Sequence, residues 1–317
     1  MLKTTDRGAR RRRMTAGLAV LLAAGLGLGP AGCSAAAPDG LPNAEASAPA
    51  TADGGMGDMP GMAEVTGAPT TAALAAAAPS GTGLSASLHG YTLVPAAKTV
   101  PANAASAYRF RIDGPDGKPV TRYQPYESAF VLCYVIRSDL TGFRSLQPAM
   151  REDGTWTVSL PALPAGAYRA FATFAAPDSS QGKPLLYQLS SPFTVPGPVA
   201  APSPAPAPVA SATVDGYTVA LSGSPRAGVS GPLQMVVSKG ASVVESFQRY
   251  LDSYVHLTAF HAGDLAFAQI LSLGGVQAST GQMTAEALFP ESGTWQVFAQ
   301  FDLDGSVHTA ALTLDVH

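Results

Sequence analysis

Three methionines, Met56, Met59 and Met62, recur at every third position of a segment that otherwise contains mainly Ala, Gly, Pro, Ser and Thr. Thioether sulfur is a soft donor that suits Cu(I), and a pliable segment can bring three such sulfurs around one ion. The spacing therefore predicts a Cu(I) or heavy-metal site in this segment. Methionine as filler in a low-complexity spacer is the alternative interpretation.

His256 is the histidine that we consider as a further metal ligand beside these methionines. It lies five residues before His261 in an apolar stretch. Side chains alternate between the two faces of a strand, so residues five apart point to opposite sides and the pair cannot chelate one ion. His256 shares its face with Thr258 and Phe260, where a lone histidine can equally be packed or exposed without binding a metal.

No motif for catalysis is present in the sequence. The chain has no His-Glu-x-x-His, Cys-x-x-Cys or Gly-x-Ser-x-Gly pattern and no phosphate-binding Gly-rich loop with Lys. Asp302 and Asp304 beside Gly305 could suggest calcium, but a two-residue hairpin turn explains them. We therefore interpret the protein as non-catalytic, without an enzymatic cofactor.

The N-terminus has the pattern of an export signal. A basic cluster precedes an apolar run from Met14 to Leu28, which is short for a membrane span of about 20 residues. The run ends in Ala31-Gly32-Cys33, which resembles a bacterial lipobox. We predict that residues 1–32 are a signal peptide and that Cys33 is lipidated, so that the protein is anchored on the extracytoplasmic face of the cell membrane. Ordinary cleavage nearby, with a secreted protein, is the alternative.

Charge argues against nucleic acid as a partner, and the cysteine content argues against disulfide bonds within the chain. Removal of residues 1–32 leaves 13 of the 19 basic and 21 of the 22 acidic residues, a formal charge of −8. A chain with this charge is a poor ligand for nucleic acid. The chain has two cysteines, Cys33 and Cys133. If Cys33 carries a lipid, Cys133 has no intramolecular partner, so no internal disulfide framework is expected. Cys133 lies in an apolar run, which predicts a buried thiol.

Low-complexity segments divide the chain. Residues 33–84 are mainly Ala, Gly, Pro, Ser and Thr and predict a disordered, lipid-anchored stalk, while residues 196–212 predict a Pro-rich linker. Two domains, 85–195 and 213–317, remain. They resemble each other with a nearly constant shift in numbering, which indicates a duplication. The matched segments are His89–Leu93 with Asp215–Val219, Ala129–Tyr134 with Tyr254–Ala259, and Ala165–Phe174 with Ser292–Phe301.

Each copy contains short alternating segments bounded by turn residues. Tyr108–Ile112 and Thr155–Leu160 alternate between apolar and polar side chains, and Asp304-Gly305 predicts a hairpin between two such segments. About seven strands in about 100 residues are typical of an immunoglobulin-like sandwich. We predict an all-β protein of two tandem immunoglobulin-like antiparallel β-sandwiches.

The stretch Asp139-Leu140-Thr141-Gly142-Phe143, followed by Asp153-Gly154-Thr155-Trp156, resembles modules of secreted or lipid-anchored proteins from high-GC Gram-positive bacteria (actinobacteria). Those modules read Asp-Leu-x-x-Phe-x-His-x-His-Pro and imply extracytoplasmic metal handling. Here Ser145 and Gln147 replace the two histidines and Leu132 replaces one on the preceding strand. The second copy keeps His256, whereas Gln269-Ile270-Leu271-Ser272 replaces its later histidines.

These features favour a lipoprotein that acts as a binding or interaction module at the cell surface, with an unknown protein partner. The alternative is a copper-binding protein that uses the methionines. Copper binding that resides in residues 34–84 alone would indicate the stalk, and binding that stays with residues 85–317 would indicate a domain site.

Overall fold

A computed structural model describes residues 81–177, 183–199 and 207–317. Cys33 and the three stalk methionines lie outside these residues, so their predicted roles stay predictions. All regular structure in the described ranges is β-strand, which confirms the predicted all-β class. No helix in them is long and apolar enough to cross a membrane.

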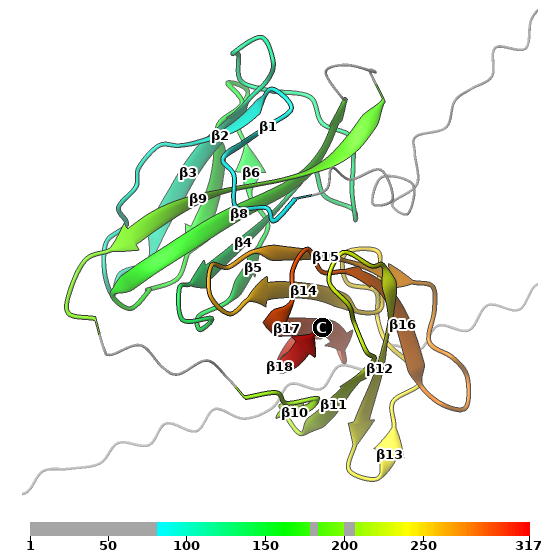
Figure 1. The fold of residues 1–317 in the computed structure, drawn as a ribbon. Coiled ribbons are helices and arrows are strands. Elements are labelled where there is room, and N and C mark those ends of the chain that lie inside the picture. Colours follow the sequence, from blue (N-terminus) through cyan, green and yellow to red (C-terminus); the bar gives the residue numbers. More distant parts are fainter. Residues whose placement is uncertain (1–80, 178–182, 200–206) are drawn as a thin grey trace, which may run out of the picture. The chain divides into compact units, whose positions relative to one another are not determined.

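The first copy consists of two antiparallel sheets (Figure 1). One sheet has the order β1-β2-β3-β7-β6 and the other has the order β5-β4-β8-β9. The strands are β1 (Ser87–Leu88), β2 (Tyr91–Pro95), β3 (Ser106–Asp113), β4 (Val131–Arg137), β5 (Arg144–Leu146), β6 (Ala149–Met150), β7 (Trp156–Leu160), β8 (Gly166–Pro177) and β9 (Pro184–Val195).

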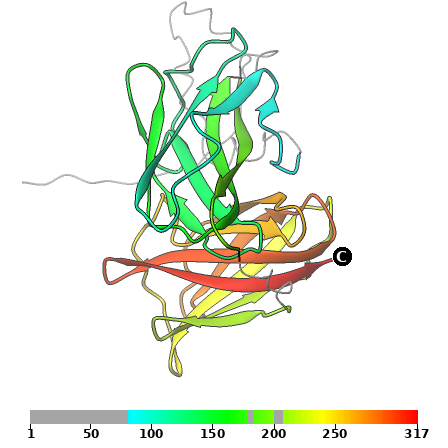
Figure 2. The same cartoon turned by 90° about the vertical axis from the view of Figure 1, so that its left-hand side faces the viewer.

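The second copy forms one continuous sheet of nine strands in the order β10-β11-β12-β16-β15-β14-β17-β18, with β13 beside β12. Because β15 pairs with both β14 and β16, the sheet folds over and its two halves enclose one core. The long β17–β18 hairpin is the orange-red and red pair in Figure 2. The strands are β10 (Ser211–Val214), β11 (Tyr217–Ser222), β12 (Gly231–Lys239), β13 (Ser242–Val243), β14 (His256–His261), β15 (Phe267–Leu273), β16 (Gln282–Leu288), β17 (Gly293–Leu303) and β18 (Ser306–Val316).

Side-chain periodicity accounts for these strands. In β3, the residues Tyr108, Phe110 and Ile112 are buried, whereas the residues between them are exposed, as expected for a strand with one solvated face. In β4, six consecutive residues are buried, because the strand packs on both faces. Cys133 points into the first sandwich and is 1% exposed, which confirms the predicted buried thiol.

The two copies have similar turns at matching positions. His89-Gly90 and Asp215-Gly216 both have positive φ at the two central positions, as required by the tight turns that join neighbouring strands. Asp304 and Gly305 adopt the same conformation and join β17 to β18, which confirms the predicted hairpin.

The strand ladders correct one segment of the predicted repeat alignment. Tyr168 and Trp295 occupy equivalent places, since each donates a hydrogen bond to the carbonyl four residues earlier. In the same register Thr173 is equivalent to Gln300. Thr173 pairs with Leu132, and Gln300 pairs with His256.

Leu132 is therefore equivalent to His256, whereas the sequence match had aligned it with Leu257. The difference in numbering between the copies is therefore one smaller in this strand than in the turn that follows it. The second copy thus has one residue more than the first between the strand and this turn, not before the strand. In that turn Leu140 and Leu265 are equivalent again, because both have φ near +65°.

A third apolar cluster joins the two copies. Tyr134 and Ile136 of β4 meet Phe260 of β14 and Phe298 of β17. The rings of Phe143 and Phe298 stack with centroids 4.1 Å apart. This third core, defined by these residues and their buried neighbours, positions the polar groups described next.

Candidate functional site

His256 lies at the start of β14, inside the third core, with both ring nitrogens beside polar atoms of the first copy. Nε2 is 2.7 Å from the hydroxyl of Tyr134. Nδ1 is 2.9 Å from Oε2 of Glu127, close enough for an ion pair but without the alignment of a hydrogen bond. All three residues are buried. Because isolated polar groups are costly inside a protein, this Glu–His–Tyr chain ties the two copies together.

A tight turn positions Glu127. Residues 127 and 128 both have positive φ, and Tyr126 and Ala129 exchange two backbone hydrogen bonds across the turn. The turn places the carboxylate under the third core, where it is only 4% exposed. The equivalent turn of the second copy carries Leu251 at this position, so the acid belongs to the first copy alone.

Tyr134 stays neutral in this environment. Burial raises its pKa well above the usual value, and the nearby carboxylate of Glu127 acts in the same direction. The neutral phenol can donate its proton to Nε2 of His256, which leaves Nδ1 as the protonated nitrogen facing the carboxylate. The ring also stacks against Phe143 and Phe267, which fixes its orientation.

A pocket of about 460 Å³ opens beside this chain, between residues of both copies. Polar and apolar groups share its lining. Apolar lining comes from Leu186, Phe267, Ile270 and Leu288, while the polar lining includes Tyr134, His256, Thr173, Gln188 and Gln269. The hydroxyl of Thr173 donates to Oε1 of Gln188, and the Nε2 group of Gln188 is buried with no acceptor among the described residues. A buried amide donor without an acceptor suits a ligand that brings a carbonyl or hydroxyl oxygen.

The segment just before β1 forms part of the pocket wall. Thr82 accepts a 2.7 Å hydrogen bond from the backbone N–H of Phe267, and Ser85 accepts one of 2.9 Å from Ser190. The segment therefore bridges both copies. Gly83 is required here, because its φ is +67° and a Cβ atom would lie 2.9 Å from Gln188. The predicted end of the stalk at residue 84 thus falls inside an ordered, hydrogen-bonded segment.

The sequence-predicted ligands are not brought together by the described residues. His256 and His261 have separate partners, as their alternation predicted. To bind a metal, His256 would have to lose its contact with the hydroxyl of Tyr134 or with the carboxylate of Glu127. Its role as a metal ligand stays a prediction. Leu132, which replaces a histidine of the resembled modules, is buried in the third core, and Gln147 is exposed. Sequence reasoning missed Glu127, Tyr134 and Gln188, because no local pattern marks a contact between copies.

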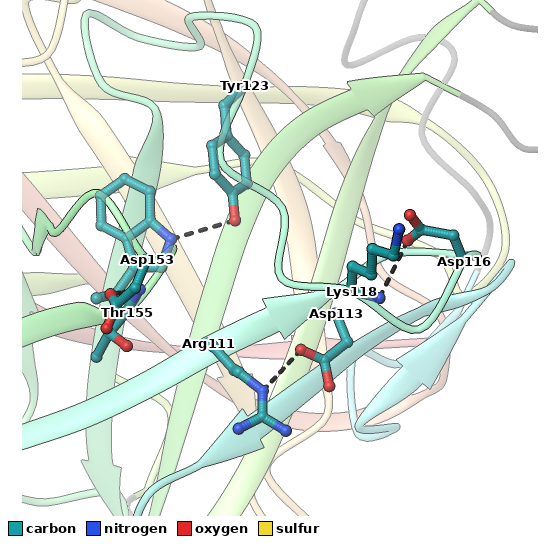
Figure 3. A network of polar contacts seen from close by, with 8 residues as sticks. Arg111, Asp113, Asp116, Lys118, Tyr123, Asp153 and Thr155 are labelled. Carbon is teal, nitrogen blue, oxygen red and sulfur yellow. Dashed lines mark hydrogen bonds and ion pairs between the residues drawn. The ribbon is translucent and has the colours of Figure 1, made fainter.

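The Asp-Gly-x-Trp motif of the first copy has a structural role. Asp153 accepts a 2.9 Å hydrogen bond from the backbone N–H of Thr155 and closes a turn. The indole of Trp156 donates to the hydroxyl of Tyr123 over 3.2 Å (Figure 3). Neighbouring polar pairs in the same view, Arg111 with Asp113 and Lys118 with Asp116, are also exposed turn or strand contacts.

Comparison with known proteins adds one family match. A family described as a domain of unknown function (DUF8832) matches residues 212–317, which is the second copy. No curated protein matches the chain.

Solved structures match weakly. InvD of Yersinia pseudotuberculosis is 15% identical over 73% of this chain and 58% of its own, with a TM-score of 0.23. The Escherichia coli adhesin FdeC is 12% identical over 72% and 64%, with a TM-score of 0.24. The Y. pseudotuberculosis adhesin InvE is 15% identical over 71% and 58%, with a TM-score of 0.22. This chain spans less than two thirds of each of these chains. TM-scores this low carry no functional argument, and the fold class rests on the sheet topology.

Proposed function

We propose that the protein is a non-catalytic, lipid-anchored binding module on the extracytoplasmic face of the cell membrane, and that the pocket between its two sandwiches is its binding site. The observation that carries the proposal is the buried Nε2 donor of Gln188 in the pocket of about 460 Å³. Ligand sites are typically about 300–1,000 Å³, mostly apolar, with a few polar groups that fix orientation.

The pocket lining indicates the chemical class of ligand. Among the described residues that line it there is no Lys, Arg, Asp or Glu, so a neutral molecule suits the pocket better than an ion. Apolar side chains from β15 and β16 would hold a flat or aliphatic body. The Nε2 group of Gln188 would donate a hydrogen bond to an oxygen acceptor of the ligand, because the hydroxyl of Thr173 already donates to Oε1 of Gln188. A small neutral amphipathic molecule fits these groups.

Binding of the neutral fluorophore 1-N-phenylnaphthylamine to the full chain tests the pocket. We expect saturable binding at one molecule per chain, and loss of that binding in Leu288→Trp, which fills the pocket from β16. Leu273→Trp is the matched control, because Leu273 lies on neighbouring β15 and is 45% exposed. Non-saturable binding, or equal binding by the two variants, would overturn the proposed site.

Gln188→Leu separates the polar role from the apolar one. The fluorophore lacks a carbonyl, so this variant should bind it as the wild type does. A carbonyl-bearing analogue, 1-acetylnaphthalene, should bind the variant about 5- to 10-fold more weakly, the value of one hydrogen bond to a buried group. Equal weakening of both probes would mean that the substitution only reshapes the pocket.

The anchor is tested independently of the pocket. We expect wild-type protein to sediment with membranes and the Cys33→Ala variant to appear in the medium, because the proposed lipid on Cys33 would anchor the chain after the signal peptide is removed. Fractionation and immunoblotting measure the distribution. Membrane retention of the Cys33→Ala variant would contradict lipidation at this residue.

Copper binding by the methionines is the second candidate, supported by their spacing. A Cu(I) titration of the full chain against a colorimetric chelator tests it, beside a version with Met56, Met59 and Met62 changed to Leu. Tight stoichiometric binding that is lost in the Leu version would support a metal-binding stalk. Equal weak competition by both would contradict it.

A further inference from the structure

A second group of potential ligands lies in the second copy, away from the pocket. His261 ends β14, Asp264 lies in the turn to β15, and Glu291 lies in the corner before β17. Nδ1 of His261 is 3.0 Å from Oδ1 of Asp264 and 3.3 Å from Oε1 of Glu291. One ligand atom from each of the three residues lies within 4.8 Å of the others. We name these residues the His-Asp-Glu cluster.

The equivalent positions of the first copy carry other residues. Arg137 occupies the position of His261, since each packs over the glycine that opens the next long strand, Gly166 or Gly293. Arg137 pairs with Asp139 at 2.5 Å, a fixed ion pair. The position equivalent to Glu291 is a proline, Pro164, because each lies four residues before the aligned Tyr168 or Trp295.

Two replacements therefore distinguish the copies. A guanidinium, which is permanently protonated and cannot ligate a metal, is replaced by an imidazole, which can. A proline is replaced by a carboxylate. Both changes add potential metal ligands at the same corner of the sandwich. In the first copy the Arg137–Asp139 ion pair occupies this corner and no such ligands are needed for folding.

The cluster is held in place by its surroundings. A Cβ atom on Gly293 would lie 2.6 Å from Nε2 of His261, so glycine there makes room for the ring. The indole of Trp295 packs 5.2 Å from the imidazole and donates a hydrogen bond to the carbonyl of Glu291. Asp264 accepts a 2.9 Å hydrogen bond from the N–H of Ala266. Burial opposes the ionisation of Asp264, but this bond and His261 outweigh it and lower its pKa.

One oxygen of the cluster lacks a hydrogen-bond donor. Nδ1 of His261 carries at most one proton, and the ring is aligned to give it to Asp264. The single atom Oε1 of Glu291 is covered, although its side chain as a whole is 37% exposed; it faces the same nitrogen and receives no hydrogen bond from the described residues. A cation between the three atoms would satisfy this oxygen, which the imidazole proton cannot do while it serves Asp264.

We propose that the His-Asp-Glu cluster is a binding site for a divalent transition-metal ion of the Zn(II) type. Nδ1 of His261, Oδ1 of Asp264 and Oε1 of Glu291 are the ligands, and water completes the coordination. One nitrogen and two carboxylates suit Zn(II) better than Ca(II) or Mg(II), which prefer oxygen ligands throughout. Side-chain exposures of 19%, 45% and 37% give the ion access from solvent. Binding moves the imidazole proton to Nε2 or releases it to water.

Zn(II) titration of the full chain against a chromophoric chelator tests the site. We expect one ion per chain and at least a 10-fold loss of affinity in Glu291→Gln, which keeps the shape of the side chain but removes its charge. Co(II) should give visible absorption in the wild type that is absent in His261→Asn.

His308→Asn is the matched control, because His308 faces a single carboxylate, Asp215, at 2.7 Å. It should bind Zn(II) as the wild type does, as should the version with the three stalk methionines changed to Leu. If His261→Asn fails to fold, the far more conservative Glu291→Gln still decides the matter. Wild-type affinity in Glu291→Gln, or equal loss in His308→Asn, would show an ordinary ion-pair cluster and overturn the site.

Discussion

Burial of Cys133 changes the chemistry of its thiol. Its environment raises the pKa to about 12, because an anion inside the first sandwich would lose its hydration. A thiol in the unfolded chain ionises near pH 8.5. The neutral thiol therefore favours the folded state most fully below about pH 8.5, and this stabilisation is lost as the pH rises through the folded-state value.

Alkylation of Cys133 should consequently report unfolding. At pH 8 we expect iodoacetamide to leave Cys133 unmodified in native protein and to modify it fully in denaturant. Peptide mass mapping distinguishes it from Cys33. Rapid modification without denaturant would contradict the buried position of the thiol.

Asp139 illustrates a carboxylate whose local bonds outweigh its burial. Burial alone would raise its pKa, but the side chain and backbone N–H of Thr141, together with Arg137, lower it. A lowered folded-state pKa means that the carboxylate stabilises the fold above about pH 4. That contribution is lost as the pH falls through the folded-state value.

Asp139→Asn should therefore destabilise the protein by about 1 kcal/mol at pH 7, the value of a hydrogen bond network of this size at a partly solvated site. Urea denaturation at several pH values measures the effect. We expect the difference from wild type to shrink as the pH falls below about 4 toward the lowered folded-state pKa, because Asp139 is protonated first in the unfolded chain and then in the folded protein. A difference that is constant with pH would show that the charge is not the cause.

At the scale of elements, the turns restrict sequence most strongly where space is short. Gly240 and Gly281 have nearly equal φ, +61° and +60°. A Cβ atom at residue 240 would meet nothing within 4 Å, whereas one at residue 281 would overlap Cγ1 of Val243 and lie 2.7 Å from the carbonyl oxygen of Val244. A residue with a Cβ atom would meet the same backbone strain at both positions, so the two positions differ only in their neighbours.

Gly240→Ala should cost about 1 kcal/mol of unfolding free energy, because alanine rarely adopts this φ. Gly281→Ala should cost about 1–3 kcal/mol more, since the backbone at residue 244 must move. Chemical denaturation of the two variants measures the difference. Equal losses would mean that the β13 segment shifts freely.

Strand β4 links the element scale to the whole molecule. One of its faces fills the first sandwich with Val131, Cys133 and Val135, and the other supplies Leu132 and Tyr134 to the third core. Burial on both faces explains why β4 is a continuous apolar run, whereas β3 alternates. The same strand therefore stabilises its own copy and holds the polar chain that reaches the other.

At the scale of the molecule, the third core makes the stability of the two copies interdependent. Phe298→Ala removes a ring that is 6% exposed and stacked on Phe143 of the other copy. We expect a loss of about 3 kcal/mol. Hydrogen exchange should accelerate in β4 as well as in β14 and β17.

Phe130→Ala is the control for this substitution, because Phe130 is 53% exposed and lies just before β4. It should leave both the unfolding free energy and the exchange rates nearly unchanged. Accelerated exchange confined to the second copy in Phe298→Ala would contradict the coupling and show that the sandwiches unfold independently.

Local sequence patterns were sufficient for much of the architecture. Alternation in β3, the apolar run around Cys133 and the Asp304-Gly305 turn predicted strands, burial and a hairpin, because these depend on residues close in the chain. The internal match predicted two similar sandwiches. It missed the one-residue shift in β14, since only the hydrogen-bonded ladder distinguishes an insertion before a strand from one in the turn after it.

The contacts that make the sites were decided by tertiary structure alone. Periodicity indicates which face of a strand is buried, but not what that face meets. Glu127 and His256 belong to different copies, and they meet because two sandwiches pack through side chains that belong to neither core. Glu291 approaches His261 for a similar reason, as the corner before β17 folds back over the end of β14. Side chains of this kind carry no local signal, because their partners are set by packing between distant segments.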